Sequence, residues 1–214
     1  MAAAKKEMIR VGRALYECGF HAALAGNLSA RTGDDRILCT AHGADKGSLT
    51  SDTLLVCDMM GNPIEGGGRP TSEIQMHLAA YQARPDVGAV IHAHPPTATA
   101  FAAASLPLDS LMLPEMLVWL GPIVLVPYAT PGSEELAAQL RPFFSGHDAF
   151  LLENHGALSL GQNLAQAAQR MELIEQNARV TMGVYQLGRQ PFTLKPEQAE
   201  ALTMLRRRLS EAAS

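Results

Sequence analysis

An apolar run ends abruptly in histidines and prolines at residues 88–96, GAVIHAHPP. The run is typical of a β-strand, which we expect at 87–93, and proline cannot continue the hydrogen bonding of a strand. Residues i and i+2 of a strand point to the same side, ~6.6–7 Å apart along the backbone, so His92 and His94 share one face. The two histidines therefore either end a buried strand by coincidence or form part of a metal site.

Helical and strand patterns alternate along the rest of the chain. Further strands are expected at 37–40, 54–58, 123–127 and 149–153, with a turn at 60–62. Helices are expected at 4–18, 72–84, 97–104, 133–140, 163–185 and 196–212. This alternation predicts an α/β fold, and the turn-linked early strands indicate a mixed rather than all-parallel sheet. No linker or repeat interrupts the pattern, so residues 1–214 are expected to form a single domain.

Composition narrows the partners and the compartment. With 47% hydrophobic residues, the 214-residue chain can bury a sizeable core. A net charge of -4, spread without basic blocks, argues against nucleic acid as a partner. No stretch is apolar enough for a signal peptide or membrane span, and the three cysteines form no CxxC pair. A reducing cytoplasmic location is therefore expected.

A third histidine has a setting similar to that of the first two. His155 follows an apolar run in AFLLENHGALSL, so its strand also ends in a polar segment. Strands that open at the same edge of a sheet bring such residues into one crevice. Three imidazoles are neutral ligands that leave a metal ion its full charge and an open position, which suits a Lewis acid. His21, His42 and His147 are expected in loops or on the surface, and His77 is expected to pack on a helix face.

Glu73 is the candidate acid or base. It lies in the first turn of the helix that begins at RPTSE, where a carboxylate can simply cap the helix. Next to a divalent ion, the same carboxylate could remove a proton from the carbon beside a carbonyl group. Both interpretations are open from the residues alone.

Three small-residue turns could hold a phosphate. AGNLS at 25–29, TAHG at 40–43 and PTS at 70–72 each offer backbone N–H groups and hydroxyl or amide donors. Such turns form nests that bind anions without a basic surface.

Taken in order, AGNLS, TAHG, RPTSE, VIHAHP, PYATPGSEELA and ENHGAL resemble the class II aldolase/adducin family, specifically its fuculose-1-phosphate aldolase branch. The resemblance implies a single domain with a central mixed, mainly antiparallel sheet flanked by helices. It also implies that His92, His94 and His155 bind one Zn²⁺ per subunit, although other divalent transition metals are possible. Glu73 would be the catalytic acid/base.

The same resemblance implies a substrate and an assembly. A ketose 1-phosphate, fuculose-phosphate-like or deoxypentulose-phosphate-like, would be cleaved into dihydroxyacetone phosphate and an aldehyde, by retro-aldol chemistry through a zinc-stabilised enediolate. Its phosphate would be held by residues of the three turns: Asn27, Ser29, Thr40, Gly43, Thr71 and Ser72. Homotetramers with active sites at subunit interfaces are also implied. Such an interface would offer a place to bury the apolar stretch 111–126.

The sequence departs from the aldolase pattern on the aldehyde side. Fuculose-phosphate aldolases use a tyrosine in the segment matching about 108–116 and another in the C-terminal tail, and neither tyrosine is present here. Glu115 is a candidate replacement donor. TAHG also replaces a more usual Thr-Pro-Ser/Thr-Gly.

Other activities on the same scaffold stay open. They are a methylthioribulose-1-phosphate dehydratase, which the segment ADKG after Thr40 resembles, a sugar-acid phosphate decarboxylase and, least favoured, a pentulose-phosphate 4-epimerase. A non-enzymatic adducin-like protein would have no use for the three histidines and Glu73.

Overall fold

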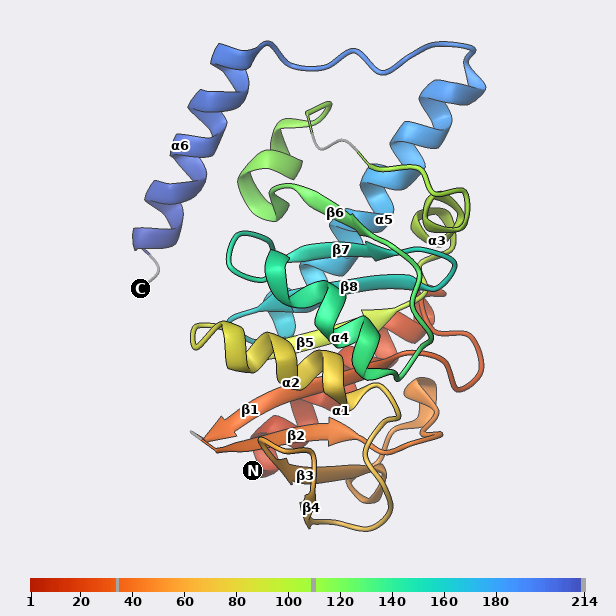
Figure 1. Ribbon diagram of the computed structural model, residues 1–214, viewed down its shortest axis with the longest axis vertical. Coiled ribbons are helices and arrows are strands. Elements are labelled where there is room, and N and C mark those ends of the chain that lie inside the picture. The colour runs from red at the N-terminus through yellow and green to blue at the C-terminus, as the bar shows by residue number, and fades with distance from the viewer. Residues whose placement is uncertain (34, 109–110, 213–214) are drawn as a thin grey trace.

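One eight-stranded sheet runs through the protein (Figure 1). The computed structural model describes residues 1–33, 35–108 and 111–212. The strands are β1 (Asn27–Gly33), β2 (Arg36–Thr40), β3 (Leu54–Asp58), β4 (Pro63–Glu65), β5 (Ala89–Ala93), β6 (Ile123–Val126), β7 (Ala149–Leu152) and β8 (Gly156–Gly161). Their order is β4-β3-β2-β1-β5-β8-β7-β6, and of these pairs only β6–β7 is parallel. The predicted mixed, mainly antiparallel sheet is confirmed.

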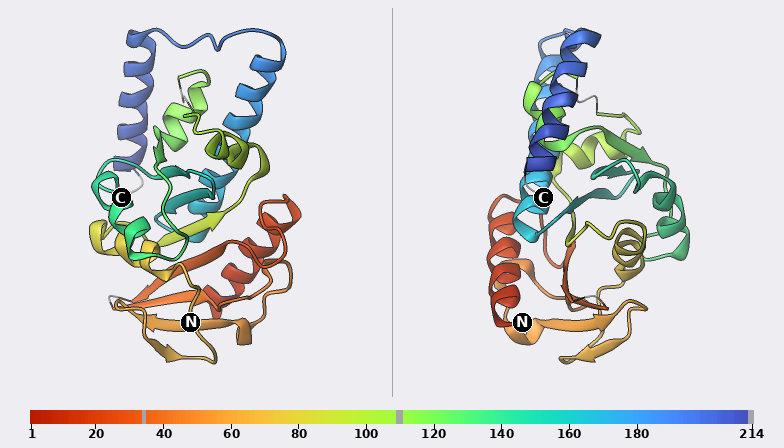
Figure 2. Two further views of the ribbon diagram at one scale, coloured as in Figure 1. Left: turned by 45° about the vertical axis from the view of Figure 1, so that its right-hand side comes forward. Right: turned by 90° about the vertical axis from the view of Figure 1, so that its left-hand side faces the viewer.

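Helices cover both faces of the sheet (Figure 2). They are α1 (Ala2–Glu17), α2 (Ile74–Ala83), α3 (Pro96–Ala103), α4 (Glu134–Leu140), α5 (Leu164–Gln186) and α6 (Pro196–Ala212), with a π-helical turn η3 at Met116–Leu120. One apolar core joins α1, α3 and α5 to the sheet, and a second core joins α2 and α4 to its other face. None of the described helices is both long and apolar enough to cross a membrane.

Two interior strands of the sheet were not predicted. The segment AGNLS at 25–29 was interpreted as a turn, yet Asn27–Gly33 forms β1, and GALSLG at 156–161 forms β8. Both segments are rich in small and polar residues, so their local strand propensity is weak, and pairing with neighbouring strands on both sides compensates for it. Because β8 lies between β5 and β7, the two strands that precede the histidines are not direct neighbours, but they open at the same edge.

Candidate metal centre

The three predicted ligands come together. His92 and His94 lie at the end of β5, and His155 lies in the turn between β7 and β8. One ring nitrogen from each of the three lies within 4.8 Å of the others, and the Nε2 atoms of His92 and His94 are 3.0 Å apart. Ligands of a tetrahedral ion with metal–nitrogen bonds of ~2.0–2.1 Å are roughly 3.3 Å from one another, so the cluster has a suitable size.

The local backbone gives His155 and its neighbours room to approach. Asn154 has a φ of 52°, a left-handed conformation that asparagine tolerates better than most residues, and it turns the chain directly before His155. Gly156 follows at a crowded position, because a Cβ there would lie 2.5 Å from the His94 ring and 2.6 Å from the Ala93 carbonyl oxygen. The turn therefore favours asparagine before His155 and glycine after it.

The His92 and His94 side chains favour the neutral state that a metal ligand needs. Burial lowers the pKa of His92 well below its usual value and also lowers the pKa of His94. His92 Nδ1 donates to the Ala157 carbonyl oxygen at 2.9 Å, which leaves Nε2 as the atom with a free lone pair. A carbonyl in this position is the usual partner of a metal-binding histidine.

Glu73 faces the same cluster. Its carboxylate oxygens lie 3.1 Å from His155 Nε2 and 3.4 Å from His92 Nε2, and Asn27 Nδ2 donates to Oε2 at 2.8 Å. Glu73 is the N-cap residue of α2, but its side chain makes no capping hydrogen bond. Burial alone would raise the pKa of this carboxyl, yet its interactions with the His92 and His155 rings and the hydrogen bond from Asn27 lower the pKa below its usual range. The carboxylate is therefore held ionised beside the three rings.

A buried chain of hydrogen bonds holds Asn27, the hydrogen-bond donor to Glu73, in place. His77 bonds to Asn27 Oδ1 at 2.6 Å and to Ser29 Oγ at 2.7 Å, and Ser29 in turn bonds to Tyr81 Oη at 2.8 Å. Burial lowers the pKa of His77 to about 4, so the ring is neutral, with one donor and one acceptor nitrogen. If Nε2 carries the proton, each group donates toward the next, and Asn27 presents its NH₂ to Glu73.

This chain of hydrogen bonds was not predicted as a unit. His77 is buried as expected, but its hydrogen bond to Asn27 Oδ1 also orients the Asn27 amide that donates to Glu73. The spacing of Glu73, His77 and Tyr81 at i, i+4 and i+8 places them on one helix face, and this signal was available in the sequence.

The three predicted phosphate turns lie side by side. Ala41 and Pro70 form a β-bridge, His42 N donates to the Arg69 carbonyl oxygen, and Leu28 N donates to Thr40 Oγ1. Within these turns, Gly43 (φ 72°) and Ser72 are exposed. Thr71 Oγ1 accepts from Glu73 N at 3.3 Å.

The side chains of Asn27 and Ser29, by contrast, are buried and already hydrogen-bonded within the protein. The turns thus converge, but their side chains are not equally free to meet a ligand.

The structure corrects one other expectation. His21 was expected in a loop or on the surface, but it is only 2% exposed, because its ring packs against the backbone at Gly26. Glu115 lies on the surface directly before η3, and residues 109–110 of the segment that matches the aldolase tyrosine lie outside the described residues. A buried lysine close to the site, Lys46, was not predicted at all.

Taken together, the fold and the site define a class II aldolase-type protein with a cluster of three histidines that could hold a metal ion. The family model of the Class II Aldolase and Adducin N-terminal domain matches residues 6–182. The chain belongs to this family, whose enzymes depend on a metal.

Curated relatives have two different activities. The chain is 36% identical to 3-oxo-tetronate 4-phosphate decarboxylase of Haemophilus influenzae, over 94% of this chain and 92% of that protein. It is 34% identical to L-fuculose phosphate aldolase of Methanocaldococcus jannaschii, over 83% and 95% of the two chains.

Solved structures give the same picture. A putative aldolase/epimerase/decarboxylase from Klebsiella pneumoniae superposes with a TM-score of 0.87 at 30% identity, covering 94% of this chain and 98% of the other. An L-fuculose 1-phosphate aldolase has a TM-score of 0.88 at 33% identity, covering 95% and 96%. The comparisons place the chain in the family and leave its specific reaction open.

Proposed function

We propose that this protein is a metal-dependent lyase that breaks a carbon–carbon bond beside the carbonyl group of a phosphorylated sugar derivative. The observation that carries the proposal is the ionised Glu73 carboxylate beside three convergent imidazoles. His92, His94 and His155 would hold Zn²⁺ or another divalent transition ion, whose positive charge would stabilise negative charge on the substrate oxygens.

Glu73 has the same task in either candidate reaction. Loss of CO₂ from a 3-oxo-tetronate 4-phosphate and loss of an aldehyde from a ketose 1-phosphate both leave the enediolate of dihydroxyacetone phosphate. A proton must then be added to carbon. Because the Glu73 carboxylate is itself ionised, it would take this proton from water and pass it to carbon. Asn27 and the hydrogen bonds behind it hold the carboxylate in one orientation.

Decarboxylation is our first candidate. A retro-aldol cleavage needs a group that removes the hydroxyl proton of the departing aldehyde, whereas a carboxylate leaves as CO₂ without giving up a proton. The absence of both aldolase tyrosines therefore favours decarboxylation, as does the 36% identity to a decarboxylase over 94% of the chain. Retro-aldol cleavage is the second candidate, supported by the 34% identity to a fuculose phosphate aldolase.

The phosphate would be held where the three turns converge. Asn27, Ser29, Thr40, Gly43, Thr71 and Ser72 are the residues that we assign to this subsite. Exposed Ser72 and the backbone at Gly43 are the groups most accessible to a ligand.

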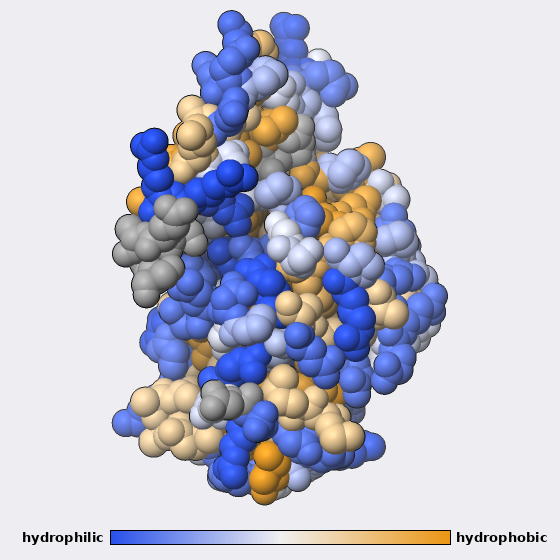
Figure 3. Space-filling model, turned by 60° about the vertical axis from the view of Figure 1, so that its left-hand side comes forward, coloured by the Kyte–Doolittle hydropathy of each residue, from blue (hydrophilic) through white to orange (hydrophobic). Residues whose placement is uncertain are grey.

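A homotetramer with sites at subunit interfaces would cover apolar side chains that are otherwise exposed. Trp119 is 57% exposed, and Leu187 and Phe192 are 78% and 91% exposed. On the face drawn in Figure 3, apolar residues reach the surface in several patches among hydrophilic ones. Light scattering after size-exclusion chromatography would test the assembly, and a monomer at micromolar concentration would contradict it.

Proton exchange tests the central proposal. Metal-loaded protein is incubated with dihydroxyacetone phosphate in deuterated water, and ¹H NMR follows the C3 hydroxymethyl group. We expect one of its two protons to be lost, and the metal-free protein and His94→Ala to be inactive. The absence of exchange with one metal per subunit would rule out both cleavage reactions and favour the dehydratase.

A second measurement separates the two candidates. Release of ¹³CO₂ from carboxyl-labelled 3-oxo-tetronate 4-phosphate would establish decarboxylation. Exchange without CO₂ release would favour the aldolase.

A further inference from the structure

Lys46 is a buried ammonium group without a carboxylate partner among the described contacts. The residue is 2% exposed, and its Nζ donates to the carbonyl oxygens of Leu24 at 2.5 Å and Ala44 at 2.6 Å. Neighbouring Asp45 directs its carboxylate to Gly47 N and Ser48 Oγ instead. Burying a charge without a counter-charge is costly, so this arrangement needs an explanation.

The position of Lys46 suggests what the missing counter-charge is. The two carbonyl groups that it holds border the turns at 25–29 and 40–43, so its Nζ lies between two of the three turns assigned to phosphate. An ammonium has three N–H donors, and with two bonded to carbonyl groups one is left for another acceptor.

The charge of Lys46 also reaches the metal centre. It contributes to the lowered pKa of His94 and of His21, and Glu73 in turn favours the protonated lysine. Burial lowers the pKa of Lys46 to about 8, so the group is mostly charged at neutral pH.

His21 adds a second polar group at this place. Its two ring nitrogens are buried and have no hydrogen-bond partner of ordinary geometry, and only the backbone of Ala25 is close enough to favour protonation. The preceding residue, Phe20, accepts a hydrogen bond from His94 N through its carbonyl oxygen, so His21 is tied to the end of β5. A buried polar side chain with unused donor capacity is expected to have a ligand or water as its partner.

We propose that Lys46 as the cation, together with the neutral His21 ring as a further polar group, forms the part of the active site that binds the phosphate oxygens of the substrate. The inference rests on the proposed function for the identity of the ligand, but anion binding can be measured without turnover. This inference gives a role to the segment Asp45-Lys46-Gly47, to which the three histidines and Glu73 assign none.

Sulfate is a suitable probe, because it is tetrahedral like phosphate and its charge stays constant from pH 6.5 to 9.5. The affinity of the metal-loaded protein for sulfate is measured by calorimetry at constant ionic strength. We expect binding to weaken as the pH rises through about 8 and above, because the ammonium loses its proton. A bound anion favours the charged lysine and raises its pKa. The loss of affinity is therefore expected at a higher pH than the pKa of the free protein would give.

The charged groups that face Lys46 do not titrate in this range. Asp45 and Glu73 have lowered carboxyl pKa values, the pKa of His21 is about 3, and that of His94 lies below its usual 6.5.

Lys46→Gln keeps donors for the two carbonyl groups but removes the charge. We expect it to bind sulfate roughly 10- to 100-fold more weakly, without the loss of affinity above pH 8. Lys46→Arg should recover most of the affinity, and Lys6→Gln, on the exposed side of α1, should behave like the wild type. Equal sulfate binding by Lys46→Gln and wild type would overturn the inference. If Lys46→Gln does not fold, a pH-independent affinity of the wild type would overturn it equally.

Proton exchange separates this inference from the proposed function. We expect Lys46→Gln to raise the KM for dihydroxyacetone phosphate more than it lowers kcat. Wild-type exchange with an unchanged KM in Lys46→Gln would reject the role of Lys46 and leave the lyase intact. No exchange by the wild type would reject the lyase, and the sulfate titration would still decide whether Lys46 binds anions.

Discussion

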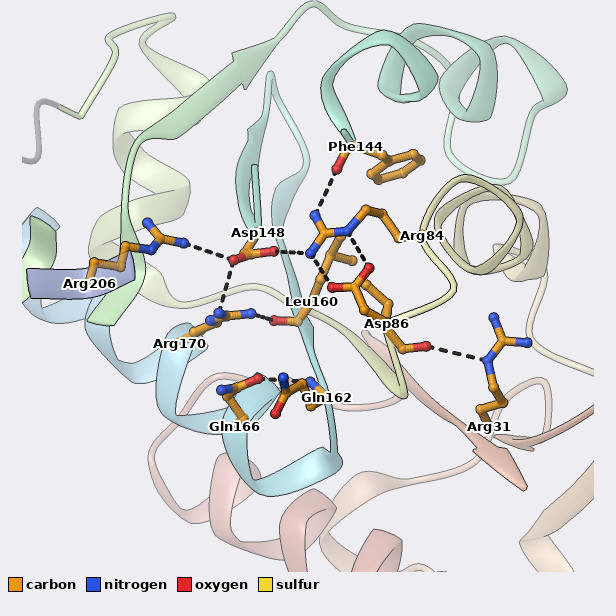
Figure 4. Close-up of polar contacts among 11 residues, drawn as sticks. Arg31, Arg84, Asp86, Phe144, Asp148, Leu160, Gln162, Gln166, Arg170 and Arg206 are labelled. Carbon is orange, nitrogen blue, oxygen red and sulfur yellow. Dashed lines mark hydrogen bonds and ion pairs between the residues drawn. The ribbon is translucent and has the colours of Figure 1, made fainter. Parts of the chain in front are cut away.

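The two ends of the central strands each hold a buried carboxylate, and the two carboxylates have opposite surroundings. At one end Glu73 faces the imidazoles of His92 and His155 and the amide of Asn27. At the other end Asp148, 6% exposed, is contacted by Arg84 at 3.2 Å and by Arg170 and Arg206 at 2.9 Å. Figure 4 shows the three guanidinium groups directed at Asp148 from different elements.

We infer from this difference that the Asp148 cluster is structural and that the Glu73 end is the functional site. Around Asp148 positive charge is abundant, and Arg84 is further paired with Asp86 at 2.6 Å, so the cluster is complete within one chain. Around Glu73 no arginine or lysine makes an ion pair among the described contacts, and the neighbouring ring nitrogens are lone-pair donors. A site with acceptors but without a cation is suited to bind one.

Glu73→Gln should have the largest effect on chemistry. The amide keeps the size and polarity of the side chain but cannot carry the proton, so we expect exchange of dihydroxyacetone phosphate to slow by roughly 10²–10⁴-fold. Metal content, measured by atomic emission, should stay at the wild-type level. Near-normal exchange would remove Glu73 from its proposed role.

Asp148→Asn should have the largest effect on stability. Three half-buried guanidinium groups would lose their shared counter-charge, and we expect a loss of about 3–5 kcal/mol in the free energy of unfolding. Urea denaturation measures this loss, with exposed Asp52→Asn as the control. Any folded fraction should still bind metal, and a stable variant that has lost its metal would contradict the distinction between the two ends.

Acid should destabilise the Glu73 end through His77. Its pKa is about 4 in the folded protein and ~6.5 when unfolded, so the unfolded chain binds the proton first as the pH falls. Stability is therefore complete above pH 6.5 and is lost between pH 6.5 and 4, by about 3 kcal/mol from this group. Denaturation of metal-free protein at several pH values should show a smaller loss in His77→Gln. His147→Gln is the control, and an equal loss in all three proteins would refute the assignment.

Arg206→Ala should have the smallest effect. Arg206 is the link between α6 and Asp148, and its guanidinium packs on Gly121, where a side chain would not fit. Because Arg206 is partly exposed and two arginines remain at Asp148, we expect a loss of about 1 kcal/mol. Thermal unfolding measures it, with exposed Arg208→Ala on the same helix as the control. A loss as large as that of Asp148→Asn would mean that α6 holds the whole cluster together.

Much of the site could be predicted because its residues have local signals. His92 and His94 are two apart in a strand, so any strand there places them on one face, and His155 follows an apolar run of the same kind. The helices were recognised well for a similar reason, since their capping residues, such as Ser133 and Asn163, are read from a few neighbouring positions.

The missed features depend on contacts between distant segments. β1 and β8 have weak propensity and become strands because the sheet pairs them on both sides. The surroundings of His21 and Lys46 are likewise made by separate loops, so neither burial nor a missing partner can be inferred from adjacent residues.

The sequence by itself determined that the chain forms an α/β domain with a histidine pair at a strand end, because periodicity and turn residues act over a few positions. Only the tertiary structure decided the roles of the charged groups. It brought Glu73 to Asn27 and His155 and surrounded Asp148 with arginines. The state of a buried charge depends on what packs around it, and residues far apart in the chain supply that packing.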